Sequence, residues 1–253
     1  VWCAAGKQTF GIDEIVNRMK HTGLEKIVSH RRLILPQLGA PGVSAHRVKK
    51  RTGFRVIYGP VRAEDLPVFL DSNMKATEEM RRVTFPLAER LVLTPIELVG
   101  GAKYVAGTAV VFFLLSGLGR HGYSVTAALH DGIFAACLLL GSFIGGAVIT
   151  PALLPWIPGR SFSFKGALVG SVLALSTVGY MLYSTGPSSG LKVGMLSWLM
   201  LMPAIASFFA MNFTGASNYT SLSGVKREMR YAVPAQISAA VLGLVLWLAG
   251  RFV

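Results

Sequence analysis

Five long stretches in the second half of this 253-residue chain carry almost no charge. The length of each stretch is close to the roughly 20 apolar residues that a helix needs to cross a bilayer. They cover residues 99–119, 126–150, 166–185, 193–212 and 232–250. Only helices and closed barrels satisfy their backbone inside lipid, so the sequence predicts a transmembrane domain over residues 99–253, an all-α bundle of five helices.

The ionisable residues inside these stretches lie close to their ends. Lys103 lies near the start of the first, and His130 and Asp131 lie near the start of the second. A carboxylate at membrane depth is costly, which makes Asp131 a functional candidate, but its place near the end favours a structural or interfacial role. Cys137, within AACLLLG, is expected to be an inert apolar residue.

Small residues recur at the spacing of helix-packing motifs. Gly141 is followed by Gly145, and Gly166 by Gly170. We expect close helix contacts at these glycines rather than a ligand site.

Basic residues between the stretches set a predicted orientation. If the N-terminal part is cytoplasmic, the inner loops hold Arg160, Lys165, Lys226, Arg227 and Arg230, against Arg120, Lys192 and Arg251 outside. This bias favours a cytoplasmic N-terminal part. The polar run NFTGASNYTSLSGVKREMRY would then be an inner loop, suited to docking that part or binding its substrate. The net charge of +13 is spread along the chain, so no nucleic-acid partner is expected.

Residues 1–98 have the pattern of an α/β domain. Helices are expected at 12–22, 45–52 (with Ser44 as cap) and 63–72, and strands at 32–37 and 54–58. This alternation predicts βα units and a parallel sheet. Two strands are few for such a sheet, so we expect a partial domain that lacks its N-terminal part.

Two glycine-bearing loops follow the predicted strands. They are PQLGAPGVSAH at 36–46 and YGPVR at 58–62. Cofactors bind at the carboxyl edge of such sheets, so these loops are candidate cofactor-binding segments. Neither contains GxGxxG, so a nucleotide is not indicated.

The chain opens on VWCAAGKQTFG, with Cys3 near its start. At the beginning of a short helix, the helix dipole and Lys7 would both favour a thiolate. Gly6 and Gly11 would let a large planar ligand approach the backbone. A structural cysteine is the alternative. Two cysteines in all are too few for a disulfide framework or a four-cysteine iron–sulfur cluster.

VWCAAGK resembles the cap-helix motif N-V-W-C-A-A-G-K of the HgcA family, the membrane-bound corrinoid proteins of bacterial and archaeal mercury methylation. The resemblance continues through HRRLILPQLGAPGVSAHRVKKRTGFRVIYGPVRAEDLP and NFTGASNYTSLSGVKREMRYAVP, and so covers essentially the whole chain. Residues 1–98 are also similar to the corrinoid-binding domain of the corrinoid iron–sulfur protein of the acetyl-CoA pathway, which lacks the membrane tail and the cap-helix cysteine.

The resemblance implies a Rossmann-like corrinoid-binding domain and a mercury-methylating methyltransferase. Cys3 would be the catalytic residue and the lower axial ligand of the cobalt. The expected corrinoid contacts are Val1, Trp2, Cys3, Ala4, Ala5, Gly6, Lys7, Gln37, Gly39, Gly42, Tyr58 and Gly59.

The implied reaction moves a methyl group from methyl-Co(III) of a cobalamin-type corrinoid to Hg(II), giving methylmercury. A folate-type system would donate the methyl group. A ferredoxin-like protein with two [4Fe–4S] clusters would supply electrons. The implied location is the prokaryotic inner (cytoplasmic) membrane, in contact with lipid.

Two alternatives stay open. One is a membrane-anchored corrinoid methyl carrier of one-carbon or acetyl-CoA metabolism, because nothing in the sequence selects Hg(II). The other is a transporter with a cytoplasmic regulatory domain, although the stretches contain no pair of broken helices.

Overall fold

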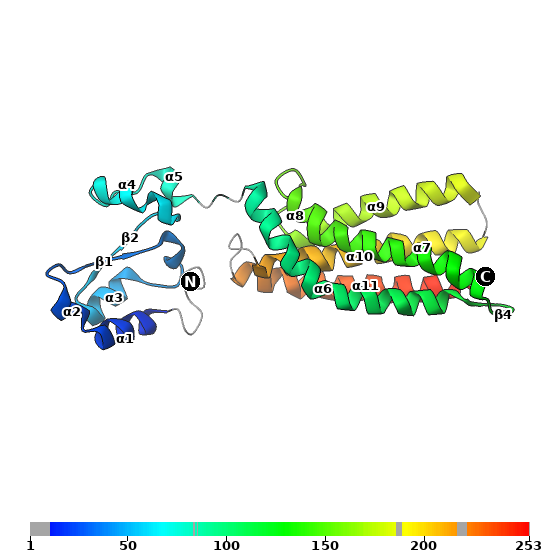
Figure 1. The fold of residues 1–253 in the computed structure, drawn as a ribbon, viewed down its shortest axis with the longest axis horizontal. Helices are drawn as coiled ribbons and strands as arrows, with labels where there is room; N and C mark the ends of the chain where they lie inside the picture. The colour runs from blue at the N-terminus through cyan, green and yellow to red at the C-terminus, as the bar shows by residue number, and fades with distance from the viewer. Residues whose placement is uncertain (1–10, 83, 85, 186–188, 217–221, 253) are drawn as a thin grey trace. The chain divides into compact units, whose positions relative to one another are not determined.

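The computed structural model describes residues 11–82, 84, 86–185, 189–216 and 222–252. The chain divides into two compact units, Val1–Thr84 and Phe85–Val253, drawn in Figure 1. The elements of the first unit are α1 (Ile12–Thr22), α2 (Leu24–Ile27), β1 (Arg32–Leu35), the 3₁₀ turn η2 (Gln37–Gly39), α3 (Ala45–Thr52), β2 (Arg55–Tyr58), the 3₁₀ turn η3 (Ala63–Asp65), α4 (Leu66–Asp71) and α5 (Glu78–Arg81).

Helix α1 matches the helix predicted at 12–22. Ile15 and Val16 are buried on one face, and two acidic residues occupy the first turn. The helix ends at Gly23, whose φ of 58° is left-handed and whose N–H bonds to the carbonyls of Lys20 and Met19. Glycine adopts this conformation without steric cost, so it ends the helix where the sequence predicts.

Strands β1 and β2 pair in parallel, from Arg32 opposite Arg55 to Leu35 opposite Tyr58. The predicted strand at 32–37 ends at Leu35, because the chain turns into η2 at Gln37. Alternate residues of the strands enter a hydrophobic cluster with α1 and α3, made of Ile15, Leu35, Val43, Val48 and Val56. The predicted parallel pairing of these two strands is therefore confirmed.

The second unit is a helical bundle. Its elements are α6 (Leu87–Ser116), β3 (Leu118–Gly119), β4 (Gly122–Tyr123), α7 (Val125–Ile144), the π-helical turn η4 (Gly145–Ile149), α8 (Thr150–Ala152), α9 (Phe162–Thr185), α10 (Ser189–Ala216) and α11 (Leu222–Ala249). Within the described residues, five helices are long and apolar enough to cross a membrane, as the sequence predicts. They begin and end at Leu87–Ser116, Val125–Ala152, Phe162–Ser184, Val193–Phe213 and Gly224–Ala249.

Two boundaries differ from the predicted spans. Helix α6 begins at Leu87 rather than near residue 99, with Pro95 inside it. The expected polar loop before the last span is mostly helical, because α10 runs to Ala216 and α11 begins at Leu222. In both cases the helix continues past the apolar segment, and hydropathy marks only the apolar part.

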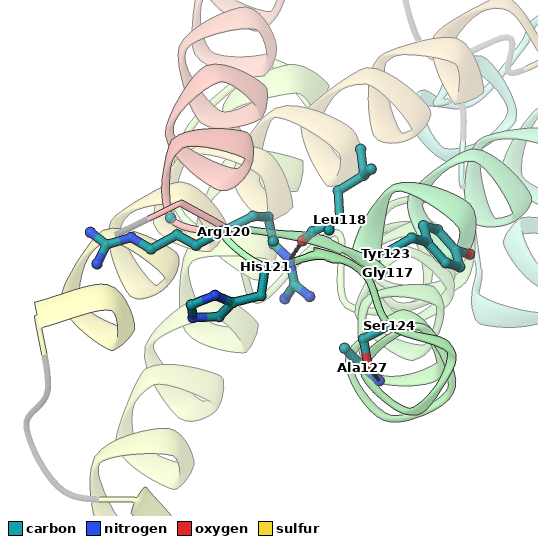
Figure 2. A pocket seen from close by; sticks show the side chains of 11 residues that line it. Gly117, Leu118, Arg120, His121, Tyr123, Ser124 and Ala127 are labelled. Atoms are coloured by element: carbon teal, nitrogen blue, oxygen red, sulfur yellow. Dashed lines mark hydrogen bonds between the residues drawn. The ribbon is translucent and has the colours of Figure 1, made fainter.

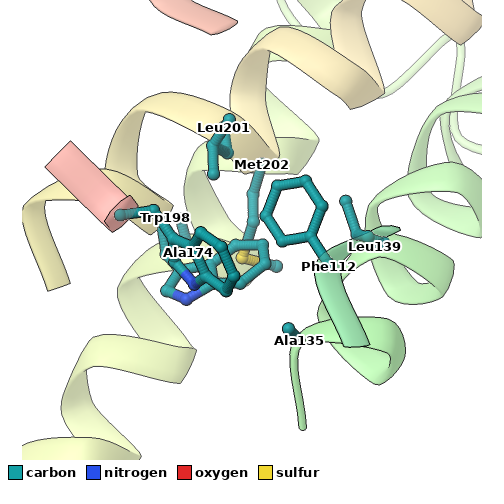
Figure 3. Close-up of a cluster of buried hydrophobic side chains, with 8 residues drawn as sticks. Phe112, Ala135, Leu139, Ala174, Trp198, Leu201 and Met202 are labelled. Carbon is teal, nitrogen blue, oxygen red and sulfur yellow. The ribbon is translucent and has the colours of Figure 1, made fainter. Parts of the chain in front are cut away.

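Helix α10 packs against the other long helices. Its Trp198, Leu201 and Met202 form the largest buried cluster, together with residues of α6, α7, α9 and α11, namely Phe112, Ala135, Leu139, Ala174 and Trp247. The rings of Phe112 and Trp247 lie with their centroids 4.5 Å apart. Figure 3 shows Phe112, Leu139, Trp198 and Met202 among the side chains of this cluster.

Three of the four glycines predicted to pack do so. A Cβ on Gly170 would lie 2.6 Å from Pro203 Cα, and one on Gly166 would lie 2.6 Å from the carbonyl oxygen of Ala206. A Cβ on Gly145 would lie 2.8 Å from Leu173 Cδ1. Among the described residues, Gly141 meets nothing within 4 Å, so its predicted contact is absent there.

Candidate functional site

The two glycine-bearing loops meet at the carboxyl ends of β1 and β2, as the parallel pairing requires. The Gly59 N–H donates to the carbonyl of Leu35 over 2.8 Å, and the Gln37 N–H donates to that of Pro60 over 3.4 Å. Gln37, Gly39, Gly42, Tyr58 and Gly59 therefore belong to one sheet edge, which we call the loop edge (residues 36–43 and 58–61).

Backbone and side-chain bonds fix the first of these loops. The Gly39 N–H donates to Pro36 over 2.9 Å, and the Val43 N–H donates back to Gly39 over 3.0 Å. The Tyr58 hydroxyl donates to the carbonyl of Val43. Tyr58 thus ties the end of β2 to the loop that follows β1, which holds the loop in one conformation.

The two buried glycines of the loop edge differ in the space beside them. A Cβ on Gly59 would lie 3.1 Å from Ile34 Cγ2 and 3.6 Å from the ring of Phe69, so this glycine permits close internal packing. A Cβ on Gly39 would meet nothing within 4 Å. Among the described residues, the space beside Gly39 is therefore open, whereas Gly59 serves the fold.

The loop edge carries no charged side chain: its sequences are PQLGAPGV and YGPV. A neutral edge with small residues fits a large, mostly apolar planar group better than a phosphate, which needs cationic donors or a glycine-rich nest. Among the described residues, no group of three or more His, Cys, Asp or Glu side chains gathers to hold a metal ion.

The predicted metal ligand lies elsewhere in the chain. Cys3, and with it Val1, Trp2, Ala4, Ala5, Gly6 and Lys7, falls outside the described residues. The geometry between this peptide and the loop edge therefore stays a prediction.

Asp131 is paired in the bundle. Its carboxylate accepts from Arg251 Nη1 at 2.5 Å and contacts His130 Nδ1 at 2.9 Å. Arg251 also donates to the carbonyls of Ser116 and Leu118. These bonds join α7, the end of α6 and the residues after α11, which supports the structural role expected for Asp131.

A cavity of about 350 Å³ lies beside this network, at the β3–β4 hairpin. Figure 2 shows the hairpin residues Gly117 to Tyr123 along it, with Ser124 and Ala127 at the start of α7. Cys137 is exposed on the surface of the bundle. Its expected role as an inert apolar residue stays a prediction.

The sequence reasoning missed Glu97. This residue lies before the predicted first span, but within α6, a helix long and apolar enough to cross a membrane. Glu97 lines a groove of about 920 Å³ between α6 and α10. The run LVLTPIELV, in which Glu97 is the only charge, was the signal that the helix extends over this residue.

Comparison of the chain with protein-family models, curated proteins and solved structures finds no match.

Proposed function

We propose that this protein is a membrane-bound, corrinoid-dependent methyltransferase that forms methylmercury from inorganic Hg(II). The observation that carries the proposal is the peptide VWCAAGK, with Cys3 in the position of the family's cobalt ligand. The five apolar helices support the membrane-bound part of the proposal. The alternative is a corrinoid methyl carrier of one-carbon metabolism, which uses the same cofactor with another acceptor.

The first unit, in this proposal, is a Rossmann-like corrinoid-binding domain. The parallel pairing of β1 and β2 supports it, because such sheets bind cofactors at their carboxyl edge. The neutral loop edge and the open space beside Gly39 suit one face of a corrin ring. Tyr58 acts as a positioning residue, since its hydroxyl fixes the loop at Val43.

Cys3 gives the proposed site its chemistry. A bound corrinoid supplies a cobalt centre that carries the methyl group. Cys3 would hold the cobalt through its thiolate, which would donate more electron density than a neutral nitrogen, as thiolates do to haem iron. That donation would favour transfer of the methyl group, with its bonding electrons, to an electrophilic Hg(II) ion. Trp2, Ala4 and Ala5 would cover the face on which Cys3 binds.

Electrons and methyl groups must come from partners. The chain has two cysteines, and a [4Fe–4S] cluster takes four. A ferredoxin-like protein with two such clusters and a folate-type methyl donor fit these needs. Both belong to the cytoplasm, so we place the first unit on the cytoplasmic side of a prokaryotic inner membrane.

The test is the ultraviolet–visible spectrum of the full-length protein reconstituted with cobalamin. We expect the spectrum of cysteine-ligated cobalt, and we expect Cys3→Ala to lose it because no other thiol of the motif can replace the ligand. Cys137→Ala is the matched control and should keep the spectrum. An unchanged spectrum in Cys3→Ala would exclude the ligand role.

Activity separates mercury methylation from the methyl-carrier alternative. Cys3→Ala should abolish methylmercury formation, whereas Cys3→His should keep a bound corrinoid with weaker donation and slower transfer. Transfer to Hg(II) and to a physiological acceptor is measured with the same purified protein. Transfer to the physiological acceptor alone would favour the carrier.

A further inference from the structure

The groove between α6 and α10 has one polar end. It is lined by Ile96, Glu97, Gly100, Gly101, Tyr104, Phe208, Phe209 and Asn212. Glu97 lies ten residues after Leu87, the start of α6, and Asn212 lies next to Phe213, where the α10 span ends. Tyr104 lies two helical turns deeper than Glu97, about 10 Å along the axis. The groove therefore runs from the membrane interface toward the apolar interior.

The polar end presents hydrogen-bond acceptors for which the described part of the chain gives no countercharge. Among the described residues, the structure gives the Glu97 carboxylate no ion pair or hydrogen bond, and the same holds for the Asn212 amide. The nearby Lys103 points its ammonium over the ring of Tyr104, 4.9 Å from the centroid. A carboxylate beside the apolar wall of this groove is costly unless a cation or a donor meets it.

The rest of the groove is apolar and open to lipid. Ile96, Tyr104 and Phe208 have exposed side chains, so their outer faces meet acyl chains in a membrane. Gly100 leaves the wall open, because a Cβ there would meet nothing within 4 Å. Gly101 instead packs against Phe143 and Phe209, and a Cβ there would lie 2.6 Å from the ring of Phe143.

We propose that this groove binds a membrane lipid with a primary-amine headgroup, of the phosphatidylethanolamine class. The ammonium has three N–H donors, and the two oxygens of Glu97 and the amide oxygen of Asn212 are three acceptors. One acyl chain lies along Gly100 and Phe208. Glu97 repels anionic headgroups, and a choline headgroup has no N–H to donate. This assignment is independent of the corrinoid.

Two substitutions test the two parts of the groove. Glu97→Gln removes the charge but keeps the shape. Gly100→Leu fills the groove without a clash, because the space at its Cβ is empty. Gly107→Leu is the matched control: Gly107 lies on the same helix, also has nothing within 4 Å of its Cβ, and does not line the groove.

The experiment is native mass spectrometry of the full chain, released from nanodiscs with equal amounts of phosphatidylethanolamine, phosphatidylcholine and phosphatidylglycerol. We expect the ethanolamine lipid to be retained about tenfold more than the others. A difference of this size is what hydrogen bonds between the ammonium and a charged carboxylate contribute to affinity. Glu97→Gln should remove the preference, Gly100→Leu should remove retention, and Gly107→Leu should change neither.

Three outcomes would overturn the proposal. Equal retention of the three lipids would show that the headgroup is not recognised. Preference for the ethanolamine lipid that survives both Glu97→Gln and Gly100→Leu would place the binding elsewhere. A dimer that forms without lipid and is lost in Gly100→Leu would make a second copy of the chain the occupant.

Discussion

At the scale of single residues, glycines decide how the bundle packs, because they have no side chain. Gly166 and Gly170 let α9 approach the backbone of α10, and Gly146 does the same for α7 and η4, since its Cβ would meet Ala206 and Phe209. Close approach allows dense van der Waals contact, which drives helix association in lipid. These glycines are therefore structural.

Gly170→Leu should destabilise the bundle. Its Cβ would lie 2.6 Å from Pro203 Cα and 2.7 Å from the Met202 carbonyl oxygen, and backbone cannot move aside cheaply. We expect a loss of about 3 kcal/mol in the free energy of unfolding, typical of overpacking. Unfolding in mixed micelles, followed by circular dichroism, measures it.

Gly179→Leu is the control for this prediction. Gly179 lies on the same helix with nothing within 4 Å of its Cβ, so its replacement should leave stability nearly unchanged. Equal losses in the two variants would contradict the packing argument.

The spacing of small residues predicted only in part which glycines pack against another helix. Gly141 has the same spacing to Gly145 as Gly166 has to Gly170, yet it meets no neighbour. The glycine pattern indicates only that another helix can approach the backbone closely. Whether another helix occupies that side depends on the arrangement of the whole bundle.

At the scale of elements, charged side chains complete helix ends at one end of the bundle. Arg90 is buried and donates to the carbonyls of Pro151 and Ala152, at 2.9 and 2.5 Å. Lys165 donates to Leu154, and Glu228 accepts from the Ser163 N–H at the start of α9. Cations thus meet helix C-terminal carbonyls and an anion meets an N-terminus, as the helix dipole favours.

Arg90→Ala should leave the carbonyls at the end of α8 without these donors. We expect a loss of about 3 kcal/mol, because each hydrogen bond to a buried charged group contributes about 1.5 kcal/mol or more. Thermal unfolding in detergent measures it. Arg160→Ala, at an exposed arginine, is the control and should shift the midpoint little. A loss in Arg90→Ala no larger than in the control would refute this role.

At the scale of the whole molecule, an odd number of spans places the two ends of the bundle domain on opposite sides of a membrane. The described residues contain five such helices. The basic loops favour a cytoplasmic first unit, and the proposed electron and methyl donors need the same side.

Labelling of single cysteines in sealed right-side-out vesicles tests this orientation. With Cys3 and Cys137 replaced by serine, we expect an impermeant maleimide to label Arg120→Cys directly. Arg160→Cys should react only after permeabilisation, because its loop lies at the cytoplasmic end. The opposite pattern would place the first unit outside and would remove its access to cytoplasmic partners.

The sequence by itself determined the local elements. Helix α1, the strands β1 and β2 and the apolar core of each span follow from periodicity, glycine stops and hydropathy, which act within a few turns of chain. It also defined the loop edge, because parallel strands bring their carboxyl ends together. The candidate cobalt ligand, Cys3, rests on the sequence alone, since it lies outside the described residues.

Only the tertiary structure decided which distant groups meet. Asp131 and Arg251 are 120 positions apart and form an ion pair, and Arg90 reaches the end of α8 across 61 positions. The groove at Glu97 exists because α6 passes α10 with glycines in between. Local patterns carry no information on these contacts, because packing chooses the partners only after the helices have formed.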